Sequence, residues 1–310
     1  MRIVVAVNPS ASFGRRKPLG PVVVERLGAA GHDVVALDRS SYDDLLAATR
    51  SAVESRPDAL VVVGGDGMVS LGTGLLAQSG IPLGIVPTGT GNDFARALGI
   101  PYEEPLEALH LLEGWLGHPP LSVDALRVRR TDGGTTWVAG GVSAGFDAFV
   151  NERANRMRRP RGRIRYDIAL VLELLRLRRV DYEITIDGRE QSVPGILVTV
   201  GNAPSVGGGI RLLPDAVIDD GLADVLVVDR LSRATFVRLF PRVAKGTHTG
   251  DARVNVSRAT RVTIDAPGVA AYGDGERIGP LPVDVEIVPG ALRVFAPPRA
   301  PGGGGSISTS

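Results

Sequence analysis

Two glycine-rich segments, 64–70 (GGDGMVS) and 87–96 (PTGTGNDFAR), each contain one carboxylate directly after a short apolar run. Glycine lets backbone amides approach phosphate oxygens closely, and a helix N-terminus after each segment favours anions. The carboxylates of Asp66 and Asp93 would repel a phosphate unless a cation such as Mg²⁺ lies between them. One such segment could be an ordinary turn with a capping residue. Two in succession favour a magnesium and nucleotide-phosphate site.

The elements around these segments alternate between strand and helix. Because parallel strands place their carboxyl ends at one edge of a sheet, both segments are predicted to face one crevice. Neither matches a Walker A motif or the dinucleotide-binding glycine fingerprint. Strands are predicted at 2–7, 33–37, 59–63 and 83–86, and helices at 19–30, 41–55, 68–78 and from Asn92.

The pattern changes near Val123. Strand-like runs separated by glycine, proline and Asp-Gly turns predict an antiparallel domain of two packed sheets, interrupted by one long helix at 163–178. The predicted strands are 123–130, 135–142, 180–188, 195–201, 222–229, 259–265, 269–273, 283–288 and 291–296.

Composition narrows the class of protein. A chain of 310 residues suits two domains, and 44% hydrophobic residues can form sizeable cores. A net charge of +1 gives no global attraction to nucleic acid, and none is expected as a partner. Without cysteine there is no disulfide or thiolate metal site. Neither a signal peptide nor a transmembrane helix is predicted, so a cytoplasmic protein is expected.

Further motifs, added to the two glycine segments, identify a family. The chain resembles the diacylglycerol kinase catalytic-domain family, especially its soluble bacterial members, with sphingosine and ceramide kinases as more distant relatives. PTGTGNDFAR is a full match, whereas Met68 replaces a threonine and Ser12 replaces a glycine. The other matching segments are NPSAS at 8–12, SVDAL at 122–126, GVSAGFDAFV at 141–150, the block at 201–228 and GDGE at 273–276.

The resemblance implies a fold and an activity. An α/β nucleotide-binding domain with a parallel sheet at 1–122 would precede an antiparallel β-sandwich lipid-substrate domain at 123–297, with ATP in the cleft between them and a disordered tail at 298–310. The enzyme would transfer the γ-phosphate of ATP to a lipid hydroxyl, by default converting diacylglycerol to phosphatidic acid in phospholipid biosynthesis. Other lipid acceptors and a homodimer remain open.

The resemblance also implies site residues. Asp66, Asp93 and Asp124 would hold a catalytic Mg²⁺ through water, with Asp66 also counted as catalytic. Glu276 would be the proton acceptor, with Asp274 as a second candidate. A structural Mg²⁺ would use the carboxylate of Asp220 and the carbonyls of Val217 and Leu222. The expected nucleotide-binding residues are Asn8, Pro9, Ser10, Ala11, Ser12, Gly64, Gly65, Asp66, Gly67, Met68, Thr88, Gly89, Thr90, Gly91, Asn92 and Asp93.

One segment, 153–179, concentrates positive charge. Seven arginines lie between 153 and 165 and three between 176 and 179, around a predicted helix with apolar residues at helical spacing. One interpretation is a peripheral contact with anionic lipid on the inner face of the membrane. The other is a helix packed on the β domain with a solvated arginine-rich end.

Two other functions remain in view. An NAD kinase-like enzyme would share Gly-Gly-Asp-Gly, although such enzymes lack PTGTGNDFAR and a similarly placed Asp-Gly-Glu. A nucleotide-binding regulatory protein that has lost catalysis is suggested only by Met68.

Overall fold

The computed structural model describes residues 1–8, 19–157, 159 and 163–298. Packing divides the chain into two compact units, one formed by Met1–Ala125 with the residues from Pro289 on, and the other by Leu126–Val288. The junctions lie within two strands, β5 (Leu121–Arg130) and β15 (Val283–Val294). Packing therefore assigns the segment after Pro289 to the first unit. The boundaries expected from the sequence, at 122 and 297, stay a prediction.

A parallel sheet forms the centre of the first unit. Strand β1 (Arg2–Val7) pairs with β2 (Asp33–Asp38) on one side and β3 (Ala59–Gly64) on the other, and β3 pairs with β4 (Leu83–Pro87). The end of β15 adds in parallel to β4. Every residue of β3 and β4 is buried, as expected for strands covered on both faces.

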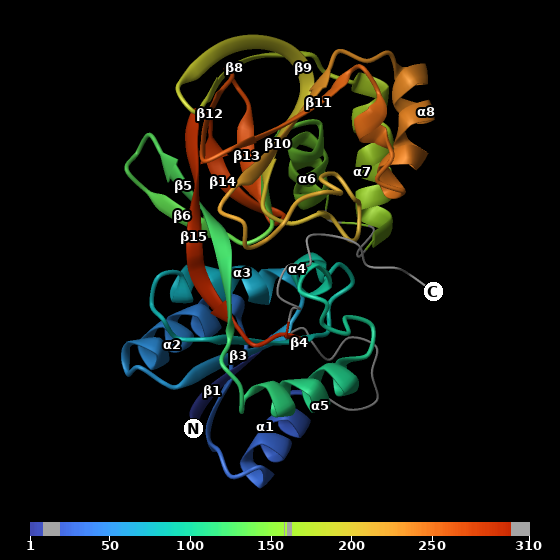
Figure 1. The fold of residues 1–310 in the computed structure, drawn as a ribbon. Helices are drawn as coiled ribbons and strands as arrows, with labels where there is room; N and C mark the ends of the chain where they lie inside the picture. The colour runs from blue at the N-terminus through green and yellow to red at the C-terminus, as the bar shows by residue number, and fades with distance from the viewer. Residues whose placement is uncertain (9–18, 158, 160–162, 299–310) are drawn as a thin grey trace. The chain divides into compact units, whose positions relative to one another are not determined.

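Helices cover both faces of this sheet (Figure 1). Helices α1 (Leu19–Ala29) and α5 (Pro105–Trp115) lie on one face, where their leucines and valines pack with inward side chains of β1 and β3. Helices α2 (Tyr42–Glu54) and α3 (Asp66–Leu76) lie on the other face. The short helix α4 (Asp93–Ala97) follows β4. The α/β part of the predicted fold is thereby confirmed.

The second unit is an antiparallel β-sandwich whose longest strand pairs along two different rows. The first half of β9 (Arg189–Gly201) pairs with β8 (Val180–Ile186), and its second half pairs with β7 (Gly141–Gly145) and β10 (Ala223–Asp229). A strand that changes partners in this way is a usual corner of a sandwich. The remaining strands are β6 (Thr135–Val138), β11 (Val254–Ala259), β12 (Arg261–Asp265), β13 (Ala270–Gly273), β14 (Glu276–Pro280) and β15.

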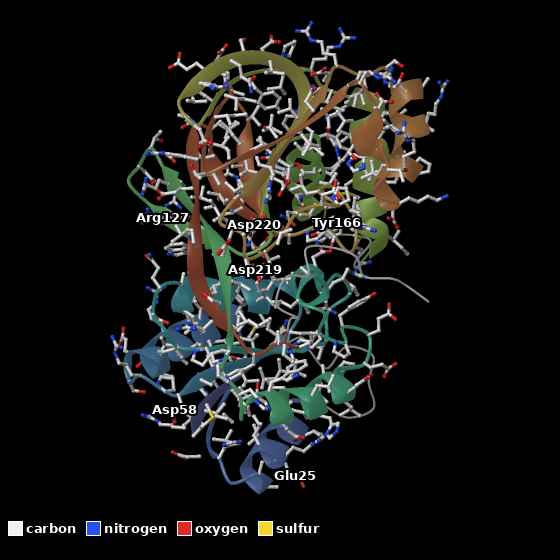
Figure 2. All side chains as sticks on the ribbon, in the orientation of Figure 1. Glu25, Asp58, Arg127, Tyr166, Asp219 and Asp220 are labelled. Carbon is white, nitrogen blue, oxygen red and sulfur yellow. The ribbon has the colours of Figure 1, made fainter. Side chains whose placement is uncertain are left out.

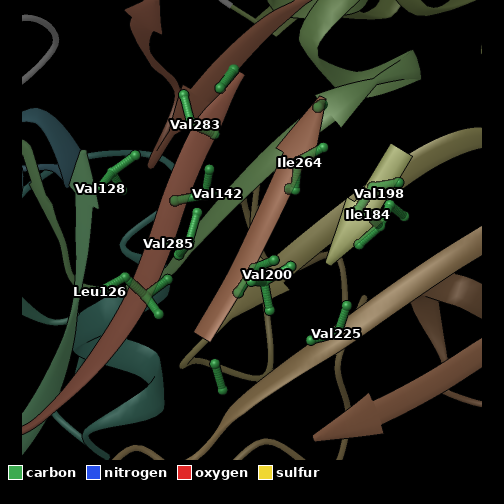
Figure 3. Packing of buried hydrophobic residues seen from close by; sticks show 14 of the residues in the cluster. Leu126, Val128, Val142, Ile184, Val198, Val200, Val225, Ile264, Val283 and Val285 are labelled. Atoms are coloured by element: carbon green, nitrogen blue, oxygen red, sulfur yellow. The ribbon is translucent and has the colours of Figure 1, made fainter. Parts of the chain in front are cut away.

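Aliphatic side chains fill the space between these strands (Figure 3). Alternate residues point inward, since neighbours along a strand face opposite sides of its sheet. Val198 and Val200 of β9, for example, are fully buried in the same cluster as Val142 of β7 and Val225 of β10. The sandwich predicted from the strand runs is therefore confirmed, with this cluster between its strands and two smaller buried clusters beside the helices and loops of the same unit.

The expectation of one helix in this unit was wrong. Besides α7 (Arg163–Arg176), the unit contains α6 (Phe146–Arg156) and α8 (Arg233–Ala244). The proline at 241 made α8 hard to predict, although Ser232 caps it by accepting from the Thr235 amide at 3.1 Å. The strand expected at 135–142 is divided in two, the one expected at 259–265 corresponds to β12, and those at 283–288 and 291–296 form one strand. Strands β11 and β14 were not expected.

Candidate active site

The loops after β3 and β4 touch backbone to backbone. A Cβ added to Gly89 would lie 2.5 Å from Cα of Gly65, and one added to Gly65 would lie 2.9 Å from Cα of Gly89. Real Cβ atoms essentially never come that close, so only glycine fits at both positions. The two predicted phosphate loops therefore form one surface at the carboxyl end of the parallel sheet.

Asp66 ties the first loop to the second. Its two carboxylate oxygens accept from consecutive amides, that of Asn92 at 3.0 Å and that of Asp93 at 2.9 Å. Burial raises the pKa of Asp66 above its usual range, and the nearby Asp93 carboxylate raises it further. The two amide bonds oppose that rise. Two carboxylates that repel each other at a glycine-rich surface favour a bound cation.

Asn92 fixes the shape of the second loop. Its backbone lies in the left-handed region, with φ of 53°, which asparagine tolerates better than most residues. Its side-chain amide donates to the carbonyls of Gly89 at 2.9 Å and Tyr102 at 3.1 Å, and its oxygen accepts from the Gly89 amide at 3.2 Å. The asparagine of the motif therefore organises the backbone, and in this arrangement its side-chain bonds go to protein.

Met68 points away from the loop surface. Its side chain is 1% exposed, and a Cβ on Gly64 would lie 2.2 Å from its Cγ. Its amide donates to the Gly65 carbonyl at 2.9 Å, inside the first turn of α3. The replacement of threonine by methionine therefore changes the packed side of the helix, and Asp66 and Gly67 still begin the turn.

Asn8 lies beside the first glycine loop. Its amide donates to the Val63 carbonyl at 3.0 Å, and its Cβ would lie 3.3 Å from a Cβ on Gly64. The asparagine of the first motif thus belongs to the same sheet end. The other expected residues of that motif, at positions 9–12, lie outside the described residues.

Asp124, the third predicted carboxylate, is buried on β5 and accepts from the Gly290 amide at 2.8 Å. Across the part of the chain that the structure describes, three or more His, Asp or Glu side chains nowhere gather closely enough to hold a metal ion. Asp66, Asp93 and Asp124 therefore do not lie close enough together to coordinate one metal ion directly. Oxygen ligands of this kind do suit a hydrated Mg²⁺ held through water, which keeps several of its own waters.

The two candidate bases of the second unit differ sharply. Asp274 sits in a β-turn with φ of 46°, and its carboxylate accepts from three buried backbone amides, those of Ala139, Gly140 and Gly141, at 2.9 to 3.2 Å. Glu276, two residues later at the start of β14, is exposed. Asp274 therefore holds the turn in place, whereas Glu276 is exposed to solvent.

The loop before β10 contains the predicted structural metal ligands. Asp220, which Figure 2 labels beside Asp219, accepts from the Leu222 amide at 3.0 Å and forms an ion pair with Arg258. Because the Arg258 guanidinium already pairs with the Asp220 carboxylate, it would compete with a metal cation for that carboxylate. Asp224 provides a different signal, because it is 4% exposed and its Oδ2 is buried without a hydrogen-bond partner. Burial raises its pKa to about 6, and Asp215 contributes.

The sequence did not single out Asp215 or Asp224. Asp224 is the more informative of the two, since a buried unpaired carboxylate oxygen beside a second carboxylate suits a hard cation. Both lie in the block at 201–228 that resembles the family. The apolar neighbours of Asp224, the run 225–228, were the one available signal.

A second polar group that the sequence did not single out is the half-buried Asp147. Asp147 lies in the first turn of α6, accepts from the Ala148 amide at 2.7 Å and forms a hydrogen bond with Ser143. Ser143 in turn lies 3.2 Å from the hydroxyl of Thr199. Burial raises the pKa of Asp147 to about 6. Burial also raises the pKa of Tyr182, whose hydroxyl donates to the Ala144 carbonyl.

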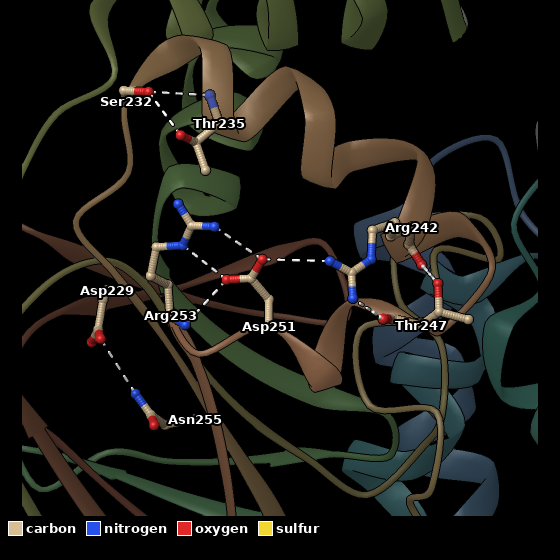
Figure 4. Close-up of polar contacts among 8 residues, drawn as sticks. All are labelled: Asp229, Ser232, Thr235, Arg242, Thr247, Asp251, Arg253 and Asn255. Carbon is tan, nitrogen blue, oxygen red and sulfur yellow. Dashed lines mark hydrogen bonds and ion pairs between the residues drawn. The ribbon is translucent and has the colours of Figure 1, made fainter.

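His248 lies in a loop that the structure explains by packing. The ring is 1% exposed, and its Nε2 lies 3.0 Å from the Leu212 carbonyl. Burial lowers its pKa. Near it, Asp251 binds Arg242 and Arg253, and the bond from Arg253 lowers the pKa of Asp251 to about 2 (Figure 4). This network anchors the end of α8 to β11.

Helix length adds one observation about membranes. Within the described ranges, no helix has the length and apolar character needed to cross a bilayer.

Comparison with known proteins adds two matched family models. Residues 2–119 match the diacylglycerol kinase catalytic domain, and residues 140–296 match the YegS C-terminal NAD kinase beta sandwich-like domain. A solved structure of a diacylglycerol kinase from Bacillus anthracis str. Sterne superimposes with a TM-score of 0.70 at 22% identity, covering 96% of this chain and 97% of that one. That likeness concerns the fold.

Sequence relatives extend over nearly the whole chain. A diacylglycerol kinase of Mycobacterium tuberculosis (strain ATCC 25618 / H37Rv) is 38% identical over 298 residues, which cover 96% of this chain and 95% of that protein. A diacylglycerol kinase of Bacillus subtilis (strain 168) is 28% identical, covering 91% of each. These matches confirm the resemblance read from the glycine segments and GDGE: the chain belongs to the diacylglycerol kinase family.

Proposed function

We propose that this protein is an ATP-dependent lipid kinase that phosphorylates the hydroxyl of diacylglycerol to give phosphatidic acid. The observation that supports this most directly is the contact between Gly65 and Gly89, bridged by the Asp66 carboxylate. Two glycine loops locked together at the end of a parallel sheet form a preorganised backbone surface for phosphate groups.

The nucleotide would be held mainly by backbone. The 11-residue helix α3 begins at Asp66, so its first amides and its dipole favour the phosphates of ATP. Asp66 and Asp93 would hold Mg²⁺ through water, with Asp124 assigned to the same role by resemblance. When bound, this ion would neutralise charge on the phosphate oxygens. Asp66 also keeps the Asn92 and Asp93 amides in place through its own hydrogen bonds.

The proton acceptor is Glu276. As the acceptor hydroxyl attacks the γ-phosphorus, its proton passes to the Glu276 carboxylate, the new oxygen–phosphorus bond forms and the bond to ADP breaks. Asp274 is a positioning residue, because three backbone amides already occupy its oxygens.

The choice of acceptor follows from the relatives, which are named diacylglycerol kinases. An acceptor of this kind lies in a membrane, so we place the protein at the cytoplasmic membrane surface as a peripheral enzyme. The second matched model is described as NAD kinase beta sandwich-like, which makes NAD the alternative acceptor to test.

The test is transfer of radiolabel from [γ-³²P]ATP to a panel of acceptors in mixed micelles. The panel contains diacylglycerol, ceramide, a sphingoid base, phosphatidylglycerol and a polyprenol, with NAD tested separately in solution. We expect labelled phosphatidic acid from the parent, and a rate lower by about 100-fold or more for Glu276→Gln, as is usual when a general base is lost. Glu103→Gln, on the exposed segment before α5, is the matched control and keeps the parent rate.

Two outcomes would contradict the proposal. Label on NAD without label on any lipid would make the chain an NAD kinase. Parent-like rates for both Asp66→Ala and Glu276→Gln would show that the assigned residues do not form the site.

A further inference from the structure

Helix α7 (Arg163–Arg176) has two apolar faces on opposite sides. One face packs inside the second unit, where Ala169 is fully buried and Leu170 and Leu174 contact the same cluster. That cluster includes Phe146, Val150 and Ala154 of α6 and Phe236 of α8. Burial against α6 and α8 is enough to explain why α7 is a helix in this place.

The other face of α7 carries five large aliphatic side chains. They follow the spacing i, i+4, i+7, i+8 and i+11, which places them on a single stripe about 180° from the buried one. These residues are Ile164 (61% exposed), Ile168 (36%), Val171 (53%), Leu172 (37%) and Leu175 (61%). Packing within the described second unit does not account for this stripe. A contiguous exposed apolar face of this kind marks an interaction surface.

Charge decides what kind of partner fits the stripe. Segment 153–179 contains ten arginines and two acidic residues, whereas the rest of the chain has 25 basic and 32 acidic residues. One of those two acids, Glu173, is buried and paired with Arg153 and Arg178. Asp167 is therefore the only acid of the described part of the segment that remains exposed. The segment that contains α7 therefore has a net charge of +8, from ten arginines and two acids, whereas the rest of the chain has a net charge of −7, from 25 basic and 32 acidic residues.

Arginines also border the stripe itself. At 100° per residue, Arg165 and Arg176 fall beside Leu172 on the same edge of the helix. The Arg165 guanidinium lies over the ring of Tyr166, labelled in Figure 2, and Arg176 is exposed. An apolar stripe flanked by arginines is the pattern of a helix lying in a membrane interface, with its cations at the level of lipid headgroups.

We infer that the exposed stripe of α7 is the surface through which this protein docks on anionic lipid bilayers. A second copy of the chain fits this face poorly, since a two-fold interface would bring two sets of arginines together. The inference rests on the proposed function in one respect: an acceptor that resides in a bilayer gives the docking its purpose. The sequence suggested either packing of the 153–179 helix on the β domain or contact with a membrane. In this inference both apply, because one face of α7 packs inside the second unit and the opposite face docks on the bilayer.

The test is co-sedimentation of the full chain with vesicles of phosphatidylcholine alone and of phosphatidylcholine with phosphatidylglycerol. We expect binding to the anionic vesicles at low salt and weaker binding as salt rises. Leu175→Ser should weaken binding about tenfold or more, since a buried leucine contributes about that factor. Its matched control is Leu106→Ser, another exposed leucine (54%) on α5 of the first unit, which should bind as the parent does.

Charge is tested separately. The double variant Arg176→Gln/Arg179→Gln should lose about tenfold or more of its affinity for anionic vesicles. Arg50→Gln changes an exposed arginine in the second half of α2 and should leave that affinity unchanged. Loss of binding with retained circular dichroism and melting temperature would locate the docking surface on α7.

Several outcomes would overturn the inference. These are no sedimentation with anionic vesicles at low salt, equal binding by Leu175→Ser and Leu106→Ser, or a parent dimer that Leu175→Ser converts to monomer without a change in vesicle binding. Phosphorylation of short-chain diacylglycerol in detergent micelles is measured in parallel. A chain that docks without phosphorylating any acceptor would contradict the proposed function alone, whereas one that phosphorylates without docking would contradict only this inference.

Discussion

Gly89→Ala probes the contact on which the proposed nucleotide site depends. The added Cβ would lie 2.5 Å from Cα of Gly65 and 2.9 Å from Oδ1 of Asn92. Carbon atoms in contact prefer about 3.5–4.0 Å, so the two loops must separate by about 1 Å. The obstructing atoms belong to backbone and to an asparagine already held by three hydrogen bonds, so neither side can yield easily.

The expected effect has two parts of different size. Forcing a methyl group into a packed contact costs about 1–3 kcal/mol of unfolding free energy. A displacement of about 1 Å among groups that position a reacting phosphate costs about 100-fold in rate. The substitution should therefore reduce ATP affinity and turnover far more than it reduces stability, which would identify the contact as functional.

The assay compares Gly89→Ala with Gly74→Ala in the last turn of α3, where an added Cβ meets nothing within 4 Å. Alanine there should raise stability by about 0.5–1 kcal/mol, as it does in helix interiors, and leave activity unchanged. Urea unfolding gives the stability, ATP titration without acceptor gives the affinity, and radiolabel transfer gives the rate. A Gly89→Ala protein with parent-like ATP affinity and turnover would refute the reasoning about the two loops.

Three further predictions concern carboxylates of the second unit. Asp274→Ala should lower the unfolding free energy by about 2 kcal/mol or more, because buried amides lose their acceptor, whereas Glu276→Gln should lower turnover without changing the urea midpoint. For Asp147, whose folded pKa of about 6 lies above the unfolded value, stability is present at low pH and lost as pH rises through about 6. Relative to Asp147→Asn, the parent should therefore lose about 2 kcal/mol between about pH 4.5 and 7.5, and parallel urea midpoints would contradict this. Finally, MgCl₂ should raise the melting temperatures of the parent and of Asp220→Asn by more than that of Asp224→Asn, since Arg258 already pairs with Asp220; the reverse order of the two variants would restore Asp220 as the ligand.

The local pattern of the sequence was sufficient to predict the α/β unit. Strands β3 and β4 are short, mostly apolar runs that end at Gly64 and Pro87, and the structure differs from their predicted ends by one residue. The contact between Gly65 and Gly89 was not predictable in the same way. The sequence shows two flexible segments, and only the parallel pairing of β3 with β4 brings them into contact.

The second unit shows where local patterns fail. The boundary between β11 and β12 lies at Thr260, whose hydroxyl and amide both bind the Asp187 carboxylate 73 positions earlier in the chain. The residues next to Thr260 give no sequence signal, such as glycine or proline, that a strand ends there. Likewise, Asp274 and Glu276 look equivalent in the motif GDGE. Their roles separate only because the loop at 139–141 supplies three amides to one of them.

Two carboxylates of the family motifs, Asp66 and Asp274, serve mainly to connect loops. Both residues lie in glycine-containing turns, and the carboxylate oxygens of both accept hydrogen bonds from backbone amides of a second loop. Each therefore joins two loops that are remote in sequence and fixes the backbone of the second loop. On that reasoning an amide in place of Asp66, which keeps the shape but offers only one acceptor oxygen, should impair the site by misplacing Asn92 and Asp93 as well as by removing charge. Asp66→Asn should consequently weaken ATP binding even when Mg²⁺ is absent, and a defect that appears only with Mg²⁺ would show that the carboxylate acts through the metal alone.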